Sequence, residues 1–395
     1  MQTRYAVVGA GLAGASTARR LAADGEEVTL IERGRPADPL GSSHGSARIL
    51  RYAYPDRLSV ELMAAARPGW EELEARSGRR LLTPTGALDH GAVRDPRQLA
   101  GVLEAVGVDH ELLSARQAAA RWPMLSFDTE VLWHPDAAVL DAESTVEAML
   151  DLAVDDGAQL LTGWEVELVE RAGTGFRLTS TDGETLEAER VVVCAGGWLP
   201  ALLRRLPVPA GFLPALHGIT VRQEQAFHFP HRPEHREPDS AEGAPGGQPG
   251  TQTRWPTFIH QSAEMTTYGL PGGRDAGFAG QKVAEYDGGP VIDSAAAQDG
   301  RVDPENRRRV VDFVRRRLPG AEPAPYAETT CLFTTTPDAA FLMDSWDGLT
   351  VISPCSGHGA KFAPLIGELG AGLAAGDVAR HRPVPAAFRA DRRIG

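Results

Sequence analysis

Lysine is almost missing from this chain of 395 residues. Its 40 basic residues include only two lysines, Lys282 and Lys361, and the remainder are arginines. A lysine ammonium is a compact charge whose pKa shifts readily on burial, whereas an arginine stays protonated. Two lysines kept against so strong a preference for arginine are therefore candidates for functional positions. The alternative is that both survive by chance on the surface.

Cysteines and long apolar runs are scarce as well. Cys194, Cys331 and Cys355 are widely spaced and odd in number, which is typical of neither a disulfide framework nor a zinc cluster. The chain has no run of about 18 apolar residues, so no membrane-spanning helix is expected. Its first residues lead directly into a strand-like segment and lack the apolar core of a signal peptide. We therefore expect a cytoplasmic protein that does not bind a membrane or a metal.

Positive charge is also in deficit. The 53 acidic and 40 basic residues give a formal net charge of −13, which makes the chain a poor general ligand for nucleic acids. Hydrophobic residues make up 42% and charged residues 24%, a mixture that excludes wholesale disorder. At roughly 100–200 residues per domain, the length predicts two or three domains.

A glycine-rich turn stands near the start of the chain. An apolar strand over 4–8 is followed by Gly9-Ala-Gly11-Leu-Ala-Gly14, a helix over 12–24, and a second strand over 27–31 that ends at Glu32. This order is typical of dinucleotide-binding folds, in which the turn carries a pyrophosphate at the helix N-terminus and the acid binds a ribose. The unit does not by itself distinguish FAD from NAD.

Further strand-like segments occur much later. The first of them cover 159–161, 165–169, 176–179 and 189–194, and the last ends at Ala195-Gly196. The separation predicts a discontinuous first domain. Two more strands, over 326–334 and 349–353, precede a glycine-rich turn and a helix over 365–375. A helix N-terminus stabilises negative charge, which suits a reduced flavin better than a reduced nicotinamide.

One segment has an unusual composition. Residues 231–254 contain four prolines, four glycines and no large apolar residue. Such a segment cannot bury enough apolar surface to order itself. We interpret it as a flexible surface loop, with an active-site lid as the alternative.

Four motifs carry a family resemblance. They are Gly9–Gly14, Gly41-Ser-Ser-His-Gly-Ser-Ala-Arg-Ile-Leu-Arg51-Tyr-Ala-Tyr54, Cys331-Leu-Phe-Thr-Thr-Thr-Pro-Asp338 and Ser356-Gly-His-Gly-Ala-Lys-Phe362. Together they resemble the monomeric sarcosine oxidase and N-methyltryptophan oxidase family, FAD-dependent amine oxidases of the D-amino-acid-oxidase superfamily. The resemblance spans nearly the whole chain, apart from 231–254.

The resemblance implies an α/β fold of two parts. The first is a discontinuous FAD-binding domain of glutathione-reductase type, Rossmann-like, over 1–85, 145–215 and 328–395. The second is an α+β substrate domain with a large mixed sheet, over 86–144 and 216–327.

Residue roles follow from the same resemblance. Cys331 matches the cysteine that bonds covalently to the flavin 8α-methyl group. Arg51 and Lys361 match the pair that holds the substrate carboxylate, and Lys282 matches the lysine at which oxygen is activated. Tyr268 matches a pocket tyrosine.

The full set of cofactor-binding residues expected on this basis is Gly9, Gly11, Leu12, Ala13, Gly14, Glu32, Arg33, Ser43, His44, Arg48, Ile49, Val166, Ala195, Gly196, Trp198, Cys331, Leu332, Gly357, His358, Gly359, Ala360 and Lys361. Arg48 matches a flavin-side arginine, and His44 supports the flavin site. His358, between two glycines, is equally compatible with a turn residue that has no chemical role.

One position departs from the family pattern. Sarcosine oxidases have an active-site histidine four residues after the lysine, and here that residue is Tyr286. We therefore expect Tyr286 in the catalytic site and a substrate other than sarcosine, such as an intermediate of a specialised biosynthetic pathway.

The expected reaction is oxidation of a secondary or N-substituted amino acid by FAD, with hydrolysis of the imine and reduction of O2 to hydrogen peroxide. The expected partners are this amino-acid-like substrate and O2, with the protein a monomer or a weak homo-oligomer. Alternatives within the superfamily are oxidation or dehydrogenation of a cyclic imino acid or a primary amino acid. More distant alternatives are an NAD-dependent dehydrogenase, a flavin monooxygenase and a non-catalytic flavoprotein.

Overall fold

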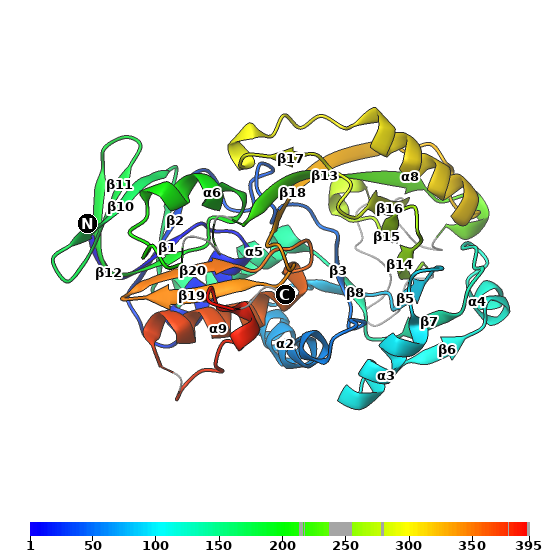
Figure 1. Cartoon of the computed structure of the whole chain (residues 1–395), viewed down its shortest axis with the longest axis horizontal. Helices are drawn as coiled ribbons and strands as arrows, with labels where there is room; N and C mark the ends of the chain where they lie inside the picture. The colour runs from blue at the N-terminus through cyan, green and yellow to red at the C-terminus, as the bar shows by residue number, and fades with distance from the viewer. Residues whose placement is uncertain (213–215, 217, 237–254, 278–279, 378, 393–395) are drawn as a thin grey trace.

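The computed structural model describes residues 1–212, 216, 218–236, 255–277, 280–377 and 379–392. The strands of this part form three sheets, of eight, nine and three strands. The eight-stranded and nine-stranded sheets occupy opposite ends of the molecule (Figure 1). Most of the predicted loop 231–254 lies outside the described residues.

The eight-stranded sheet contains the glycine-rich turn. Its strands are β1 (Gln2–Val8), β2 (Val28–Glu32), β9 (Gln159–Thr162), β10 (Val166–Ala172), β11 (Gly175–Ser180), β12 (Thr185–Val193), β19 (Leu342–Trp346) and β20 (Leu349–Ser353). The main order is β10-β11-β12-β1-β2-β9, and β20 pairs with both β12 and β19. The strands β9, β2, β1, β12 and β20 run parallel, whereas β10, β11 and β19 pair antiparallel to their neighbours.

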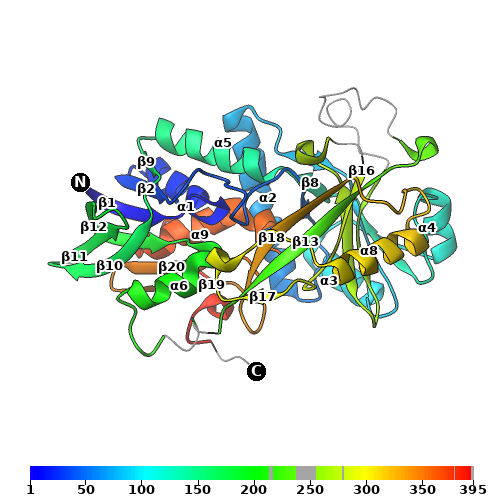
Figure 2. The ribbon, with the colours of Figure 1, turned by 90° about the horizontal axis from the view of Figure 1, so that it is seen from above.

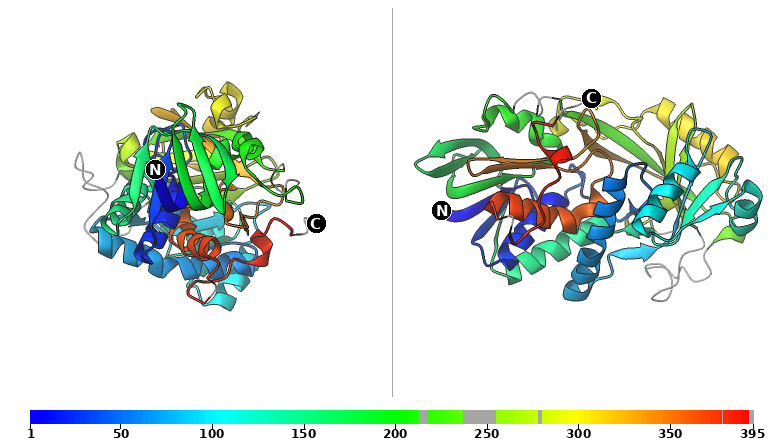
Figure 3. Two further views of the ribbon diagram at one scale, coloured as in Figure 1. Left: turned by 90° about the vertical axis from the view of Figure 1, so that its left-hand side faces the viewer. Right: turned by 60° about the horizontal axis from the view of Figure 1, so that its bottom comes forward.

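Both faces of this sheet are covered, which explains its continuous apolar sequence. Tyr5 and Val7 face a cluster formed with α1 (Leu12–Ala23), α2 (Arg57–Ser77), α5 (Ala142–Asp155) and α9 (Ala363–Ala375). Figure 3 shows these helices grouped together beside the sheet. Ala6 and Val8 point the other way, into a cluster with α6 (Leu199–Leu202) and the β10–β11 hairpin.

The nine-stranded sheet is mixed. It contains β5 (Ala87–His90), β6 (Glu111–Leu113), β7 (Val131–His134), β13 (Thr220–Pro230), β14 (Thr257–Gln261), β15 (Thr266–Pro271), β16 (Gly280–Glu285), β17 (Val291–Ile292) and β18 (Ala327–Thr335). The order is β17-β13-β16-β15-β14-β5-β7-β6, with β18 against β13. Only the β14–β5 pair is parallel.

Helix α8 (Pro304–Arg317) covers one face of the nine-stranded sheet (Figures 1 and 2). Phe313 and Val314 of the helix join Phe227, Phe258 and Val283 of the sheet in one buried cluster. Because side chains alternate along a strand, the neighbours of Val283 and Phe258 point to the opposite face. That face turns toward the eight-stranded sheet and carries Lys282.

The three-stranded sheet lies between the two larger ones. It consists of β3 (Arg48–Leu50), β8 (Ala138–Leu140) and β4 (Leu82–Pro84), all antiparallel. Helices α3 (Pro96–Val106) and α4 (Ala115–Arg121) accompany β6 and β7 at the far end of the molecule (Figure 1).

The α/β fold with a Rossmann-like sheet and a large mixed sheet is confirmed. The domain boundaries stay a prediction, and one of them meets a difficulty. Strand β18 pairs with β13 along its whole length, so the boundary expected at 328 falls inside a strand of the large sheet. Cys331, which the resemblance assigns to the cofactor, therefore lies on a strand of the large mixed sheet. Its expected contact with the cofactor does not depend on which sheet carries it.

Candidate functional site

A cavity of about 750 Å³ lies between the two large sheets, within the size range of small-molecule and cofactor sites. It collects almost all the residues expected from the sequence. These are Gly9, Gly11, Leu12, Ala13, Glu32, Arg33, Ser43, Arg48, Ile49, Arg51, Val166, Ala195, Gly196, Trp198, Tyr268, Lys282, Tyr286, Cys331, Leu332, Gly357, His358, Gly359, Ala360 and Lys361.

Two expected residues, Gly14 and His44, do not line this cavity. A Cβ atom on Gly14 would lie 1.8 Å from the carbonyl oxygen of Gly9, so Gly14 lets helix α1 pack directly under the turn. His44 lines a second, smaller cavity with His228 and Asp275. Gly14 was expected from the spacing of the glycine-rich turn and His44 from the family resemblance, and the packing places both outside the lining of this cavity.

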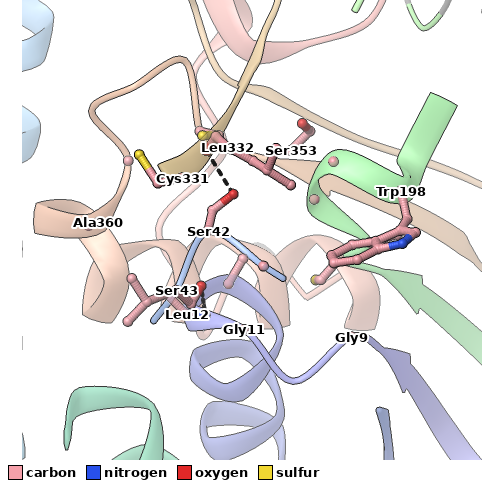
Figure 4. Close-up of a pocket in the computed structure, with 18 of the residues that line it drawn as sticks. Gly9, Gly11, Leu12, Ser42, Ser43, Trp198, Cys331, Leu332, Ser353 and Ala360 are labelled. Carbon is pink, nitrogen blue, oxygen red and sulfur yellow. Dashed lines mark hydrogen bonds between the residues drawn. The ribbon is translucent and has the colours of Figure 1, made fainter. Parts of the chain in front are cut away.

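The glycine-rich turn forms one end of the cavity (Figure 4). Helix α1 begins at Gly11, which offers no side chain to cap the helix, and Ser43 Oγ accepts a hydrogen bond of 3.0 Å from the Leu12 amide. The first amides of a helix have no partner within it and attract anions. Glu32 is the last residue of β2, and its carboxylate accepts hydrogen bonds from the amides of Ala10 (2.8 Å) and Gly34 (3.1 Å).

A second turn, Gly357 to Ala360, precedes α9 on the same wall. Ser42 Oγ donates a hydrogen bond of 2.9 Å to the carbonyl oxygen of Leu332, which ties the segment after β2 to strand β18 (Figure 4). Trp198 also lines the cavity, and its buried Nε1 has no hydrogen-bond partner among the described residues. Two helix N-termini and an unpaired indole donor fit a long, anionic dinucleotide such as FAD.

Arg51 and Lys361 form the first of two cation pairs. Both lie over the ring of Tyr54, with the Arg51 Cζ at 4.4 Å and the Lys361 Nζ at 5.7 Å from its centroid. Lys361 is buried and donates a hydrogen bond of 2.7 Å to the carbonyl oxygen of His358. Burial, together with Arg51, lowers the pKa of Lys361 well below its ordinary value. Such a pair, in a low-dielectric wall, is suited to bind a carboxylate.

Tyr54 and His358 support this pair. The Tyr54 hydroxyl lies 3.3 Å from His358 Nδ1, and burial raises the pKa of Tyr54 to about 12. The His358 ring also stacks on Phe341 at 5.0 Å, and burial lowers the pKa of His358 to about 3. His358 therefore contacts both Tyr54 and Phe341, and its role in the chemistry stays a prediction. Tyr54 was not singled out from the sequence, although it ends the motif that contains Arg51.

A buried ion pair lies behind Arg51. The Arg94 guanidinium donates to Asp89 Oδ1 at 2.6 and 3.0 Å, and Asp89 is fully buried. Arg94 and Arg51 both donate to the carbonyl oxygen of Ala53. Burial raises the pKa of Asp89. The charge of Arg94 and the neighbouring His134 lower it by more, so the pKa of Asp89 is well below its usual range. No motif marks Asp89, although Arg94 follows it by only five residues, and its other neighbour, His134, comes from β7.

Lys282 and Arg48 form the second pair. Lys282 is 5% exposed, and its Nζ donates a hydrogen bond of 3.2 Å to the carbonyl oxygen of Ala47. Arg48 donates to Ala47 O at 3.0 Å and to His44 O at 2.7 Å. Burial, followed by the charge of Arg48, lowers the pKa of Lys282 to about 8. This ammonium is therefore poised to release its proton near neutral pH.

Cys331 and two tyrosines complete the lining. Burial raises the pKa of the Cys331 thiol and that of Tyr268. The Tyr286 hydroxyl donates a hydrogen bond of 3.0 Å to the carbonyl oxygen of Ser356, and its ring packs against Phe333 at 5.6 Å. Tyr286 thus lies in the cavity wall, and burial raises its pKa to about 12.

Asp89→Asn is expected to lower the free energy of unfolding at neutral pH by about 3–5 kcal/mol, because it leaves Arg94 without its buried carboxylate. The folded-state pKa of Asp89 lies below its unfolded value. The stability that the charged carboxylate contributes is therefore present above about pH 4 and lost as the pH falls through the folded-state pKa. In urea titrations the deficit of the variant should shrink below about pH 4.

The matched control is Glu130→Gln. Glu130 pairs with Arg97, whose side chain is 75% exposed, so its loss should cost less than about 1 kcal/mol. Equal effects of the two substitutions at neutral pH would contradict the role of Asp89.

Neither a membrane span nor a metal cluster is found within the described ranges. No helix there is long and apolar enough to cross a bilayer. No group of three or more His, Cys, Asp or Glu side chains in these ranges is placed to hold a metal ion.

Comparison with known proteins identifies the family. Residues 4–373 match the family of FAD dependent oxidoreductases. Monomeric sarcosine oxidase of Streptomyces avermitilis is 31% identical over 93% of this chain and 92% of its own length. N-methyl-L-tryptophan oxidase of Yersinia pestis is 27% identical over 92% of this chain and 93% of its own length.

Among solved structures, NikD, described as an unusual amino acid oxidase essential for nikkomycin biosynthesis, has a TM-score of 0.79 at 23% identity, covering 98% of both chains. Glycine oxidase from Geobacillus kaustophilus has a TM-score of 0.75 at 19% identity over both full lengths. These two likenesses concern the fold. The chain belongs to the FAD dependent oxidoreductase family and is a flavin-dependent oxidase that acts on CH–NH bonds.

Proposed function

We propose that the enzyme oxidises the C–N bond of a secondary or N-substituted amino acid other than sarcosine, with release of hydrogen peroxide. The observation that carries this proposal is the convergence of Arg51 and Lys361 on the cavity wall beside Tyr54. An arginine fork and a lysine in a buried wall satisfy a carboxylate, and a carboxylate is the group that amino acids share.

FAD, when bound, supplies the electron acceptor for this oxidation. The chain itself positions the substrate. Arg51 and Lys361 hold its carboxylate, and Tyr268 and Tyr286 line the space in which the remainder of the substrate lies. Fixing both partners of a reaction in this way supplies as much as about 7–11 kcal/mol of the barrier.

Lys282 serves the second half of the reaction, in which O2 is reduced. The first electron transfer to O2 creates an anion. One ammonium about 4 Å away stabilises an anion by about 4 kcal/mol at an effective dielectric constant near 20, which corresponds to about a thousandfold in rate. Lys282 and Lys361 both line the cavity but donate to different carbonyl oxygens, those of Ala47 and His358. This difference supports separate roles for the two lysines.

The substrate is expected to be larger than sarcosine. Tyr286 replaces the histidine of sarcosine oxidases, and its hydroxyl is already engaged by Ser356, so it offers the substrate an aromatic surface rather than a titrating group. A relative named for N-methyl-L-tryptophan is consistent with a bulky side chain. The fold likeness to a biosynthetic amino acid oxidase supports a substrate from a specialised pathway.

The first experiment is peroxide release by the purified yellow protein from a panel of N-methyl, N-alkyl and cyclic secondary amino acids. Primary amino acids and the carboxamides of the same compounds serve as controls. We expect turnover in one secondary class and none with the carboxamides. Arg51→Met should raise KM by about 10–100-fold, since a charge-assisted hydrogen bond contributes about 1.5–3 kcal/mol. A flavin-loaded protein that releases no peroxide with any compound would contradict the proposal.

We further propose that Cys331 is attached to FAD. The thiol lines the cavity on β18. The attachment forms one S–C bond to the 8α carbon and removes one S–H and one C–H hydrogen, and O2 takes up the two electrons and both protons as hydrogen peroxide. Acid precipitation should give a yellow pellet from the unsubstituted protein and a yellow supernatant from Cys331→Ser. Cys355→Ser, which alters another cysteine of the cavity, should keep its yellow pellet.

The two lysines provide matched variants for the two half-reactions. Lys282→Met should slow reoxidation of the reduced protein by O2 by about a hundredfold or more, with little effect on reduction by substrate. Lys361→Met should slow reduction at low substrate concentration and leave reoxidation unchanged. Stopped-flow absorbance at the flavin band measures both. Equal effects of Lys282→Met on both half-reactions would exclude a role specific to O2.

A further inference from the structure

A second cavity, of about 270 Å³, is lined by His228, the strand partner of Lys282. Its wall comes from the segment after β2, from the start of β18 and from α5, and its polar side chains are those of Arg35, His44, Glu143, His228, Asp275, Glu328 and Thr329. It shares only Arg35 and Ala37 with the lining of the main cavity. The cofactor site described above does not explain this polar hollow.

Sheet register brings His228 against Lys282. The two residues are direct partners in the β13–β16 pair, so their side chains lie on the same face of the sheet, within about 4.5–5.5 Å at Cβ. The pKa of His228 is lowered to about 4, first by burial and then by the charge of Lys282. Three further groups lie near the Lys282 ammonium. Asp275 and Cys331 raise the pKa of Lys282, and Arg48 lowers it.

Two ring nitrogens at this place lack partners. His228 Nδ1 and His44 Nε2 are buried and form no hydrogen bond with any described residue. Buried polar atoms beside a roomy polar hollow are usually satisfied by water. Burial is the main cause that lowers the pKa of His44 to about 4 as well, so both imidazoles are neutral at pH 7. A neutral imidazole has one donor and one acceptor nitrogen, which allows it to pass a proton on.

Lys282 needs a supply of protons. Reduction of O2 to hydrogen peroxide consumes two electrons and two protons. The reduced cofactor provides both electrons and one proton. The remaining proton must come from the protein or from solvent. Lys282 Nζ can donate it, because its pKa is near 8, but it must then be protonated again before the next turnover. A substrate and a dinucleotide in the main cavity would cut Lys282 off from solvent on that side.

We propose that the second cavity holds water and that His228, with His44, carries protons from it to Lys282 Nζ during O2 reduction. Asp275 places a negative charge on the wall of this cavity, and its carboxylate accepts a hydrogen bond from Ser46. The inference rests on the proposed role of Lys282. It adds His228 as a residue that acts through Lys282 and assigns the second cavity as the entrance for protons.

The test compares His228→Phe, which fills the space with an apolar ring, with the unsubstituted protein. Both proteins, loaded with FAD, are reduced with dithionite and mixed with oxygenated buffer, so that no substrate is required. Reoxidation is expected to slow by about a hundredfold, the lower end of what a positioned proton donor contributes. It should also acquire a larger solvent isotope effect, because proton delivery becomes limiting.

A second readout does not depend on turnover. The chain has only Lys282 and Lys361 as lysines, so acetylation by acetic anhydride near pH 8 can be assigned to each by mass spectrometry. With FAD bound, His228→Phe should lower acetylation of Lys282 and leave that of Lys361 unchanged. His228→Gln, which keeps a hydrogen-bond donor and an acceptor but does not pass a proton on, should reoxidise as slowly as His228→Phe, and recovery of the rate in this variant would contradict the role of His228 as a proton carrier.

The matched control is His260→Phe. His260 is an equally buried histidine on the opposite face of the same sheet, where it packs against Phe313, and its replacement should leave both readouts unchanged. If His228→Phe reoxidises and labels like the unsubstituted protein, the second cavity is not the proton entrance. If Lys282→Met also reoxidises normally, the proposed role of Lys282 itself is wrong, so the two failures can be distinguished.

Discussion

Four buried or half-buried cations on one cavity are the constraint on which the rest of the site depends. Arg48, Arg51, Lys282 and Lys361 all line the same space, where burial penalises every charge and each arginine repels the neighbouring lysine. The lowered pKa values of the two lysines are the consequence. Such a site suits anions, and the ones we propose to enter it are a dinucleotide, a carboxylate and the reduced forms of O2.

The surrounding structure is organised to tolerate these charges. Backbone carbonyls take up the hydrogen bonds of the cations, and two carboxylates, Asp89 and Asp275, stand behind the arginines at a distance from the cavity. Neither of these two acids lines the main cavity, whose own acidic residues are Glu32, Asp38, Glu165 and Glu167. The two cation pairs are also kept apart, one beside Tyr54 and the other beside Ala47, which allows one pair to serve the substrate and the other to serve O2.

Much of the site could be predicted from the sequence because its motifs are local. The turn Gly9–Gly14 and the acid Glu32 follow from chain direction and strand length, and both occupy the places expected. The resemblance supplied the long-range members such as Tyr268 and Cys331. The boundary near 328, which stays a prediction, falls inside β18, and nothing in the composition of β18 reveals that this strand pairs with β13.

The sequence by itself determined the dinucleotide turn, the run of parallel strands and the exceptional status of two lysines, because each depends on residues a few positions apart or on a bias that runs through the whole chain. Only the tertiary structure decided which wall each side chain faces. His44 belongs to the second cavity, Asp89 stands behind Arg51, and His228 lies opposite Lys282. These placements depend on sheet register and on contacts between segments far apart in the chain, and the register of one strand against another is set by the packing of the whole core.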